Sequence, residues 1–222
     1  DICNELGLLV VEELFDGWVD AKNGNSNDFS RYFSQKVSNG PYGTDSSMTW
    51  AEAAAKSTVR RDRNDPSVIL WSLGNEVQEG TSRGQASSYA GIAQNIINWI
   101  KAEDTTRPAT SGDNTRGGNS NLVNVLNTIR NNGGVVGFNY ANDTSTLSSL
   151  AQNYGGGVII ASETSSATNS RGQYRNQSNN SNSDGKYHLT SYDTSAVSWG
   201  ITAHGSIYNT YQLDCVAGEF VW

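Results

Sequence analysis

The chain has 222 residues, and its 22 Asp and Glu residues outnumber its 15 Lys and Arg residues, which gives a formal net charge of −7 at pH 7. This balance makes the chain a poor candidate for binding nucleic acid or an anionic membrane surface, because binding phosphate requires clustered cations. No apolar run approaches the ~20 residues of a membrane-spanning helix, so no membrane insertion is expected. The length fits one large domain with a sizeable core.

Two cysteines, Cys3 and Cys215, are too few for a disulfide framework, and no Cys/His spacing indicates zinc, so we expect two buried thiols. The chain starts at Asp1 without an initiator methionine or a signal peptide, and it stops at Trp222 inside an apolar run. We expect a piece of a longer polypeptide that carries other domains. The surface, rich in Asn, Ser and Gly and poor in Lys, favours an extracellular or cell-surface location, and a cytoplasmic one stays open.

Six apolar runs have the length of β-strands. They cover 8–11, 68–71, 109–110, 135–138, 158–161 and 220–222. Polar residues do not alternate with apolar ones in these runs, which predicts strands buried on both faces, as in a parallel sheet.

Helical periodicity fills most of the stretches between these runs. It predicts helices over 49–61, 92–100, 122–129, 147–154 and 197–208. Asp143 is expected to begin the fourth, Gly133 and Gly155 are expected to follow helix ends, and His204 is expected to be a core histidine of the fifth. The polar stretch 20–48 reads as a long loop. The polar stretch 169–194, with His188 on its surface, is either disordered or an ordered loop beside an active site.

Strands that alternate with helices predict a parallel α/β fold, either an open sheet or a barrel. No glycine-rich phosphate motif follows a strand, and carboxylates follow instead, at Glu12 and Glu13, at Glu76 and at Glu163. Barrel enzymes place their chemistry at the carboxyl ends of the strands. We therefore predict a (β/α)8 TIM barrel, as a single catalytic domain over 1–222 that is incomplete and truncated at both ends.

Two of these strand ends carry the side chains that cleavage of a glycosidic bond requires. One carboxyl group protonates the leaving oxygen, and a second attacks the anomeric carbon or activates water. The run 71–76 delivers Asn75 and Glu76, and the run 159–164 delivers Glu163. Each glutamate could also be a solvated loop residue or a helix cap, and this reading stays open on position alone.

The run 62–76, DRNDPSVILWSLGNE, resembles the signature of glycoside hydrolase family 2, which contains β-galactosidases, β-glucuronidases and β-mannosidases. The resemblance continues, in the right order, through 4–10, 104–108, 137–140, 162–172 and 217–222. It implies that barrel strands 3 to 8 are present. It also implies a set of site residues: Glu76 as general acid/base, Glu163 as nucleophile, Asn75 on the sugar 2-hydroxyl, Tyr140 hydrogen-bonded to the nucleophile, and Trp222 as an aromatic platform.

The mechanism implied by the resemblance is double displacement with retention of configuration, in which Glu76 starts protonated and Glu163 ionised. Retaining enzymes hold the two carboxyl groups about 5–5.5 Å apart. Glu13 and Asp16 either bind sugar hydroxyls or form a salt bridge with an arginine such as Arg107. Metal-dependent galactosidases of the family carry a Glu where Gly17 stands and a His shortly after it, which this chain lacks, so no essential magnesium and no other cofactor is expected.

The sequence thus favours a retaining exo-β-glycosidase that removes terminal β-linked galactose from β-galactoside oligosaccharides. Alternatives within the family are a β-glucuronidase, a β-glucosidase or a β-mannosidase. An alternative of another class is a non-catalytic sugar-binding barrel, which would have no use for a paired acid and nucleophile.

Overall fold

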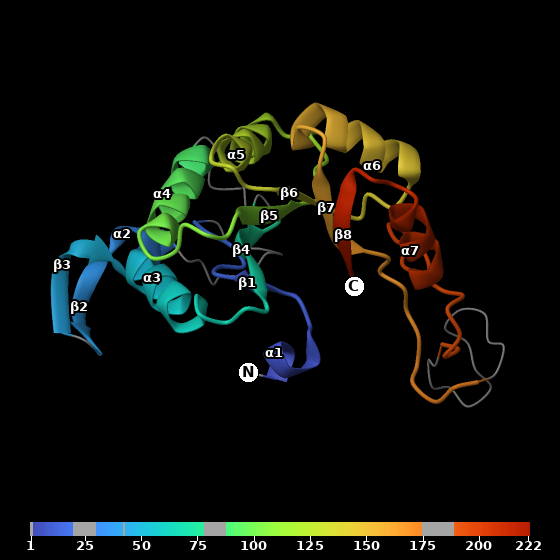
Figure 1. Cartoon of the computed structure of the whole chain (residues 1–222), viewed down its shortest axis with the longest axis horizontal. Helices are drawn as coiled ribbons and strands as arrows, with labels where there is room; N and C mark the ends of the chain where they lie inside the picture. The colour runs from blue at the N-terminus through green and yellow to red at the C-terminus, as the bar shows by residue number, and fades with distance from the viewer. Residues whose placement is uncertain (1, 20–29, 42, 78–87, 175–188) are drawn as a thin grey trace. The chain divides into compact units, whose positions relative to one another are not determined.

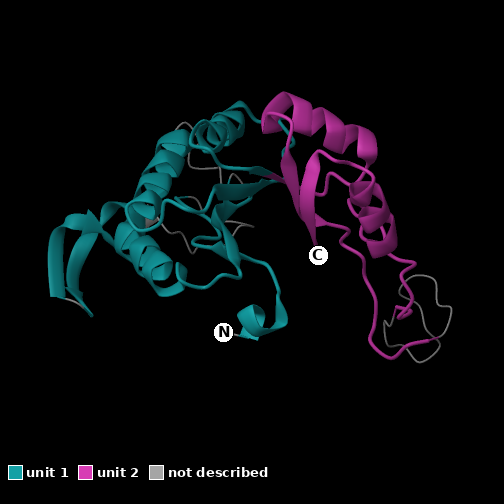
Figure 2. Cartoon of the chain, viewed as in Figure 1, with its two compact units in different colours: residues 1–136 teal, residues 137–222 magenta. Residues whose placement is uncertain are grey.

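The computed structural model describes residues 2–19, 30–41, 43–77, 88–174 and 189–222. The chain divides into two compact units, Asp1–Val136 and Gly137–Trp222 (Figure 2). Strands and helices alternate along both units (Figure 1), in agreement with the predicted α/β fold.

Three parallel strands form the sheet of the first unit, in the order β1 (Val10–Glu13), β4 (Val68–Asn75) and β5 (Ala109–Asp113). Glu13 of β1 lies opposite Ser72 of β4, and Asn75 of β4 lies opposite Gly112 of β5. All of β5 and nearly all of β4 are buried, as the continuous apolar runs predicted. Because the strands are parallel, their carboxyl ends meet at one edge.

The helices of the first unit are α1 (Ile2–Leu6), α2 (Ser30–Ser34), α3 (Trp50–Asp62), α4 (Tyr89–Lys101) and α5 (Ser120–Asn131). Helices α3, α4 and α5 lie side by side in chain order, and α4 and α5 contact β4 and β5 (Figure 1). Their predicted apolar stripes are buried, including Ile96 and Ile100 of α4 and Leu126 and Ile129 of α5. Trp99 packs against Phe33, with ring centroids 6.3 Å apart.

The expected long loop over 20–48 is wrong for its described part. Helix α2 is followed by an antiparallel hairpin of β2 (Lys36–Gly40) and β3 (Gly43–Thr49). The two strands are mostly exposed and polar, so they lack the apolar pattern that marks a strand in sequence. The indole of Trp50 holds the hairpin against α3, since a Cβ on Gly40 would lie 2.8 Å from its Cη2 atom.

The second unit contains β6 (Val136–Asn139), β7 (Ile159–Thr164) and β8 (Val216–Val221), with β7 between the other two. β7 and β8 are parallel, and Ala161 lies opposite Glu219. Helix α6 (Thr144–Leu150) continues into a π-helical turn, Ala151–Gly155. Asp143 caps α6 as predicted, and its carboxylate accepts hydrogen bonds from Thr146 N and Ser145 Oγ. The order of these strands in the sheet is the one expected of barrel strands 6 to 8.

The helix predicted over 197–208 is wrong in its start, because α7 spans Ala203–Tyr211. Thr202 caps α7, and Asp193 Oδ1 and Oδ2 accept from the backbone N–H groups of Ala203 and His204. The preceding residues bond to the end of β7 instead of forming helix, with Ile201 N donating to Ser165 O at 2.8 Å. His204 is exposed, so the expected core histidine is also wrong.

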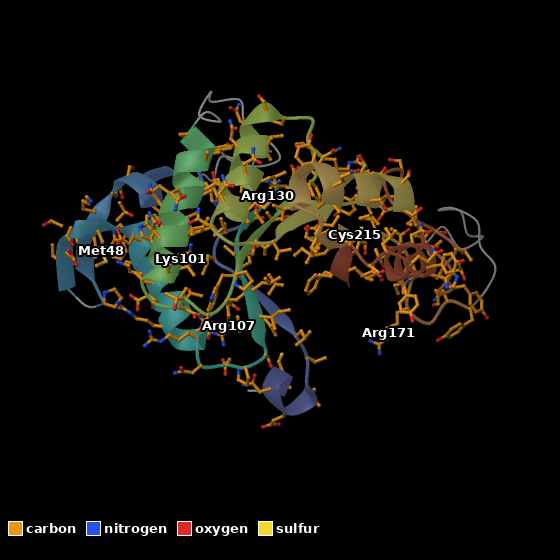
Figure 3. The ribbon with its side chains drawn as sticks, turned by 45° about the horizontal axis from the view of Figure 1, so that its top comes forward. Met48, Lys101, Arg107, Arg130, Arg171 and Cys215 are labelled. Carbon is orange, nitrogen blue, oxygen red and sulfur yellow. The ribbon has the colours of Figure 1, made fainter. Side chains whose placement is uncertain are left out.

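Three further expectations have a structural outcome. β8 begins at Val216, earlier than the predicted 220–222. Both cysteines are free thiols but only half-buried; Cys215 is labelled in Figure 3. None of the described helices, the longest of which have 13 residues, is long and apolar enough to cross a membrane. His188 lies outside the described residues.

Candidate active site

The end of β4 is shaped by a tryptophan from the segment after β1. Trp18 is fully buried and donates its Nε1–H to Leu73 O at 2.8 Å. A Cβ on Gly74 would lie 2.9 Å from Trp18 Nε1 and 3.0 Å from Phe15 O, so only glycine fits at this position. The Gly in the run before Glu76 is therefore required by packing.

Asn75 and Glu76 follow directly and are held by their backbones. Asn75 N donates to Asp16 O at 3.0 Å, and Glu76 N donates to Gly112 O at 2.9 Å. Glu76 has φ 46°, a left-handed conformation that is uncommon outside glycine, so the chain turns sharply where the strand ends. Both side chains are half-buried. The loop after β1 and the end of β5 together fix this turn.

Glu13 and Asp16 lie at the same edge of the first unit and are exposed. Glu13 Oε2 accepts a hydrogen bond from Ser72 Oγ at 3.1 Å. The guanidinium nitrogens of Arg107, the arginine named as a possible partner, donate to other groups. They bond to Asp104 and to the carbonyl oxygens of Val68, Arg63 and Asp65. Arg107 is labelled in Figure 3.

Arg107 forms an ion pair with the buried Asp104. Its carboxylate accepts from Arg107 Nη1 at 2.8 Å, from Trp71 Nε1 at 2.9 Å, and from the N–H and hydroxyl of Thr106. Burial opposes ionisation of Asp104, but the hydrogen bonds from Thr106, Arg107 and Trp71 outweigh it and hold its pKa well below the ordinary value. This ion pair fixes β4 to the segment before β5 and has a structural role.

Asp113 is a residue of this edge that the sequence reasoning missed. It ends β5 and is only 2% exposed. Its Oδ1 accepts from the N–H and hydroxyl of Thr115, while its Oδ2 has no hydrogen-bond partner. The rule that drew attention to Glu76, a polar residue at a strand's carboxyl end, applies here too. The apolar part of β5 is too short for the rule to be noticed in the sequence.

Glu163 and Tyr140 form the other part of the predicted site, in the second unit. Tyr140 Oη donates to Glu163 Oε2 at 2.5 Å, and Tyr140 N donates to Glu163 O at 2.6 Å. Tyr140 follows β6 in a left-handed conformation, with φ 55°, and its hydroxyl reaches Glu163 of β7. The hydrogen bond implied by the family resemblance is present.

Beyond Glu163 the chain reverses at Ser165 and Ser166, with φ values of 69° and 56°. Ser165 N donates to Asn142 Oδ1, and Ser165 O accepts from Ile201 N. A Cβ on Gly200 would lie 2.2 Å from Ser165 O, so this glycine permits the close approach of the two segments. Trp222 follows β8 and donates its backbone N–H to Thr164 O, and the residue is 72% exposed.

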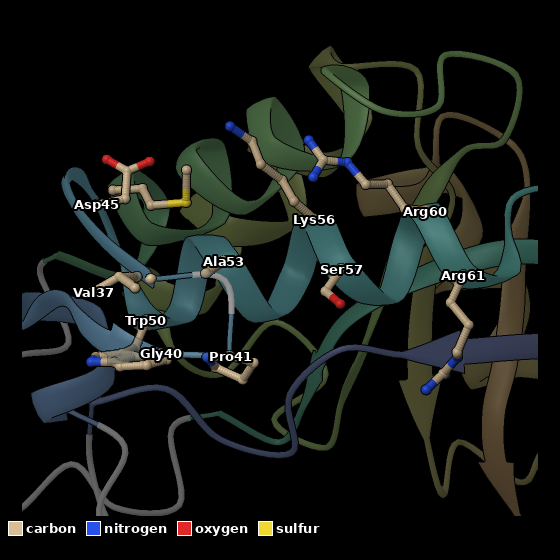
Figure 4. A pocket seen from close by; sticks show the side chains of 12 residues that line it. Val37, Gly40, Pro41, Asp45, Trp50, Ala53, Lys56, Ser57, Arg60 and Arg61 are labelled. Atoms are coloured by element: carbon tan, nitrogen blue, oxygen red, sulfur yellow. The ribbon is translucent and has the colours of Figure 1, made fainter.

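A hollow of about 720 Å³ in the first unit, between the β2–β3 hairpin and α3, is lined by none of these residues (Figure 4). Lys56 and Arg60 extend to one side of α3 and Arg61 to the other. Each of these cations has an ion-pair partner, respectively Glu52, Glu103 and Asp62. The hollow therefore offers little charge for recognising an anionic ligand, and we assign it no role.

The described residues contain no group of three or more His, Cys, Asp or Glu side chains that could hold a metal ion. The position at which the metal-dependent galactosidases carry a glutamate is the buried Gly17. Glycine offers no side-chain ligand, so these residues do not fit the magnesium site of those relatives.

Strands that alternate with helices and carry carboxylates at their ends are typical of (β/α)-barrel enzymes, and comparison with known proteins identifies the family. Residues 1–188 match the model of the TIM barrel domain of glycosyl hydrolases family 2. The chain belongs to this family, and the fold is part of a TIM barrel.

Relatives within the family differ in their named activity. Beta-galactosidase BoGH2A of Bacteroides ovatus is 27% identical over 261 aligned residues, which cover 100% of this chain and 28% of that protein. The "Putative beta-glucuronidase" of Formosa agariphila is 35% identical over 112 residues, which cover 50% of this chain and 8% of that protein. The chain thus spans well under a third of the length of these relatives.

Solved structures of the family share the fold. A glycosyl hydrolase family 2 member from Bacteroides cellulosilyticus matches with a TM-score of 0.62 and 24% identity, over 99% of this chain and 20% of that one. A β-glucuronidase from Bacteroides uniformis matches with a TM-score of 0.57 and 16% identity, over 100% of this chain and 24% of that one. At these identities the likeness concerns the fold alone.

Proposed function

We propose that this chain is the catalytic barrel portion of a retaining exo-β-glycosidase that hydrolyses terminal β-linked galactose. The observation that carries the proposal is the 2.5 Å hydrogen bond from Tyr140 Oη to Glu163 Oε2. A strand-end carboxylate held in one orientation by a tyrosine hydroxyl is suited to attack a fixed carbon atom. A solvated loop glutamate or a helix cap would not need such a partner.

In the proposed first step, a Glu163 carboxylate oxygen bonds to the anomeric carbon while the bond from that carbon to the aglycone oxygen breaks. Glu76 gives its carboxyl proton to the departing oxygen. In the second step, the Glu76 carboxylate takes a proton from water, and the water oxygen bonds to the anomeric carbon as Glu163 leaves. Two inversions give net retention, and the proposal requires carboxyl groups about 5–5.5 Å apart.

The remaining predicted residues complete the sugar site. Asn75 would bind the 2-hydroxyl, Trp222 would lie under the apolar face of the ring, and Glu13 and Asp16 would bind further hydroxyls. The exposed indole of Trp222 and the exposed carboxylates of Glu13 and Asp16 support these roles, because each is accessible to a ligand. Gly17 supports catalysis without magnesium.

The choice of galactose is supported by the Bacteroides ovatus β-galactosidase, whose match covers the whole of this chain. A β-glucuronidase is the second candidate, because the Formosa agariphila relative reaches 35% identity over half the chain. A glucuronidase needs cations for the sugar carboxylate. Arg107, near β4, is fully engaged by Asp104 and backbone carbonyls, which favours the galactoside.

We place both units in one catalytic domain over 1–222, within a polypeptide that has other domains and acts outside the cell or on its surface. The greater length of the relatives supports the further domains. Fractionating cells and assaying intact cells for activity tests the location. Activity found only in the cytoplasm would contradict it.

The decisive test of function is turnover of p-nitrophenyl β-glycosides by the full-length protein. We expect the galactoside to be hydrolysed fastest, and Glu163→Gln and Glu76→Gln to reduce kcat by at least 1,000-fold. Glu5→Gln, on the exposed surface of α1, is the matched control and should leave kcat unchanged. Faster cleavage of the glucuronide would select the second candidate. Binding of galactose without turnover of any glycoside would instead establish a sugar-binding barrel.

A further inference from the structure

Glu219 in β8 is a carboxylate that the proposed mechanism does not use. Its oxygens accept hydrogen bonds from three hydroxyl groups: Oε2 from Thr164 at 2.8 Å and Ser206 at 3.0 Å, and Oε1 from Thr210 at 2.6 Å. The three donors are buried, at 0%, 0% and 7% exposure. One side chain thereby joins β8 to the end of β7 and to two turns of α7.

The bond to Thr164 connects this cluster to the predicted nucleophile, because Thr164 is the residue after Glu163. The register of β7 against β8 is irregular between Ala161 and Thr164, so the contacts define the two side chains. Thr164 bonds to Glu219, which also bonds to Ser206 and Thr210 of α7, whereas Glu163 bonds to Tyr140. The position of the Thr164 side chain therefore affects the backbone that carries Glu163.

The backbone at this point is the end of the β7–β8 ladder, where Thr164 lies opposite Val221. Tyr140 N donates to Glu163 O, and Trp222 N and Ser166 N both donate to Thr164 O. Directly afterwards the chain enters the left-handed turn at Ser165 and Ser166, so β7 does not continue beyond Thr164. The hydroxyl–carboxylate bond is the side-chain anchor at the last residue of β7.

We propose that Glu219 is a positioning residue for the nucleophile, acting through the hydroxyl of Thr164. The inference rests on the proposed function of Glu163. A carboxylate suits this task because both of its oxygens only accept hydrogen bonds, whereas an amide offers one accepting oxygen to three hydroxyl donors. A displacement of about 1 Å at a reacting group can cost about 100-fold in rate, so an anchor behind the nucleophile has a measurable effect on kcat.

The test compares two buried threonines that bond to the same carboxylate. Thr164→Val removes the donor next to Glu163, whose hydroxyl also lies 3.4 Å from Phe220 O. Thr210→Val removes the donor on α7, whose hydroxyl also has backbone acceptors at Ser206 O and Ile207 O. In the full-length protein, kcat for p-nitrophenyl β-galactoside, or for whichever glycoside the wild type cleaves fastest, is measured together with KM and Tm.

We expect Thr164→Val to lower kcat at least tenfold with KM within twofold of wild type, and Thr210→Val to lower kcat less than threefold at a similar loss of Tm. Thr164→Ser keeps the hydroxyl and should restore at least half of the wild-type kcat. If Thr164→Val does not fold, Glu219→Gln provides the test, with an expected fall in kcat of at least fivefold.

Equal losses of kcat in the two valine variants would refute the positioning role, as would a Thr164→Ser variant as slow as Thr164→Val or a Glu219→Gln variant with wild-type kcat. Each of these outcomes is observed with a wild-type protein that hydrolyses a glycoside, so the proposed function would still stand. A wild type that cleaves no glycoside refutes the proposed function itself, so the two failures are distinguishable.

Discussion

Removing the hydroxyl of Tyr140 isolates the contact on which the proposed function depends. Tyr140→Phe deletes the donor that lies 2.5 Å from Glu163 Oε2 and leaves the ring in place. Hydrogen bonds to charged groups contribute roughly 1.5–3 kcal/mol. At about 1.4 kcal/mol per factor of ten, their loss corresponds to a rate reduction of about 10- to 150-fold.

The reduction should fall mainly on the second step. There Glu163 is the leaving group and negative charge develops on its carboxylate, so a donated hydrogen bond strengthens in the transition state. Tyr140→Phe should therefore accumulate the glycosyl-enzyme, and kcat and KM should fall together with a dinitrophenyl galactoside, whose first step is fast. Rapid-mixing experiments should show a burst of dinitrophenol equal to the enzyme concentration.

Tyr211→Phe is the matched control, because Tyr211 is 91% exposed at the end of α7 and its hydroxyl has no place in the proposed site. We expect its kinetics to equal those of the wild type. A Tyr140→Phe enzyme with wild-type kcat, or with a raised KM and no burst, would refute the argument that this hydroxyl stabilises the departing carboxylate.

Three further predictions concern stability and cofactor need. Gly200→Ala places a Cβ 2.2 Å from Ser165 O and should lower the free energy of unfolding by about 2–3 kcal/mol in urea titrations; an unchanged value would show that the turn relaxes freely. Hydrogen bonds from Ser145 and Thr146 lower the pKa of the Asp143 carboxyl from 3.8 to about 2. This stabilisation is present above the unfolded pKa and is lost as the pH falls through the folded one. Asp143→Ala should therefore cost about 1 kcal/mol at pH 7, and its difference from wild type should shrink between about pH 4 and pH 2. Asp143→Asn, which keeps a capping oxygen, should cost less at pH 7, and a pH-independent difference for the alanine variant would contradict the cap's titration. EDTA treatment should leave activity unchanged, and a loss restored by magnesium would contradict the interpretation of Gly17.

The apolar runs of the sequence predicted most of the core correctly, because burial on both faces leaves an unbroken apolar pattern. β4 and β7 appear where expected, and the stripes of α4 and α5 are buried. Local signals also identified helix ends, since Asp143 caps α6 and Gly133 has φ 81°. These features depend on residues close together in the chain.

The features that the sequence did not predict depend on contacts between distant residues. Helix α7 starts later than its apolar stripe suggests, because Ile201 bonds back to Ser165. Arg107 forms an ion pair with Asp104, which the sequence reasoning did not name as its partner. No local pattern distinguishes such partners in advance.

The sequence likewise identified some residues of the candidate site and missed others. Glu76 and Glu163 were identified because a carboxylate after a buried strand is conspicuous and the family resemblance assigned their roles. Asp113 follows a strand with only a short apolar part, and Glu219 is inside a strand, so its carboxylate could be connected to Thr164 only through the structure.

The central claim is that Glu163 becomes covalently bonded to the sugar. The most direct measurement is to inactivate the full-length protein with 2,4-dinitrophenyl 2-deoxy-2-fluoro-β-galactoside, digest it, and locate the added mass by sequencing the peptides. The proposed mechanism predicts one fluorogalactosyl group per molecule, attached to the side chain of Glu163. A label on Glu76 or any other residue, or hydrolysis of the reagent with no covalent label, would contradict it.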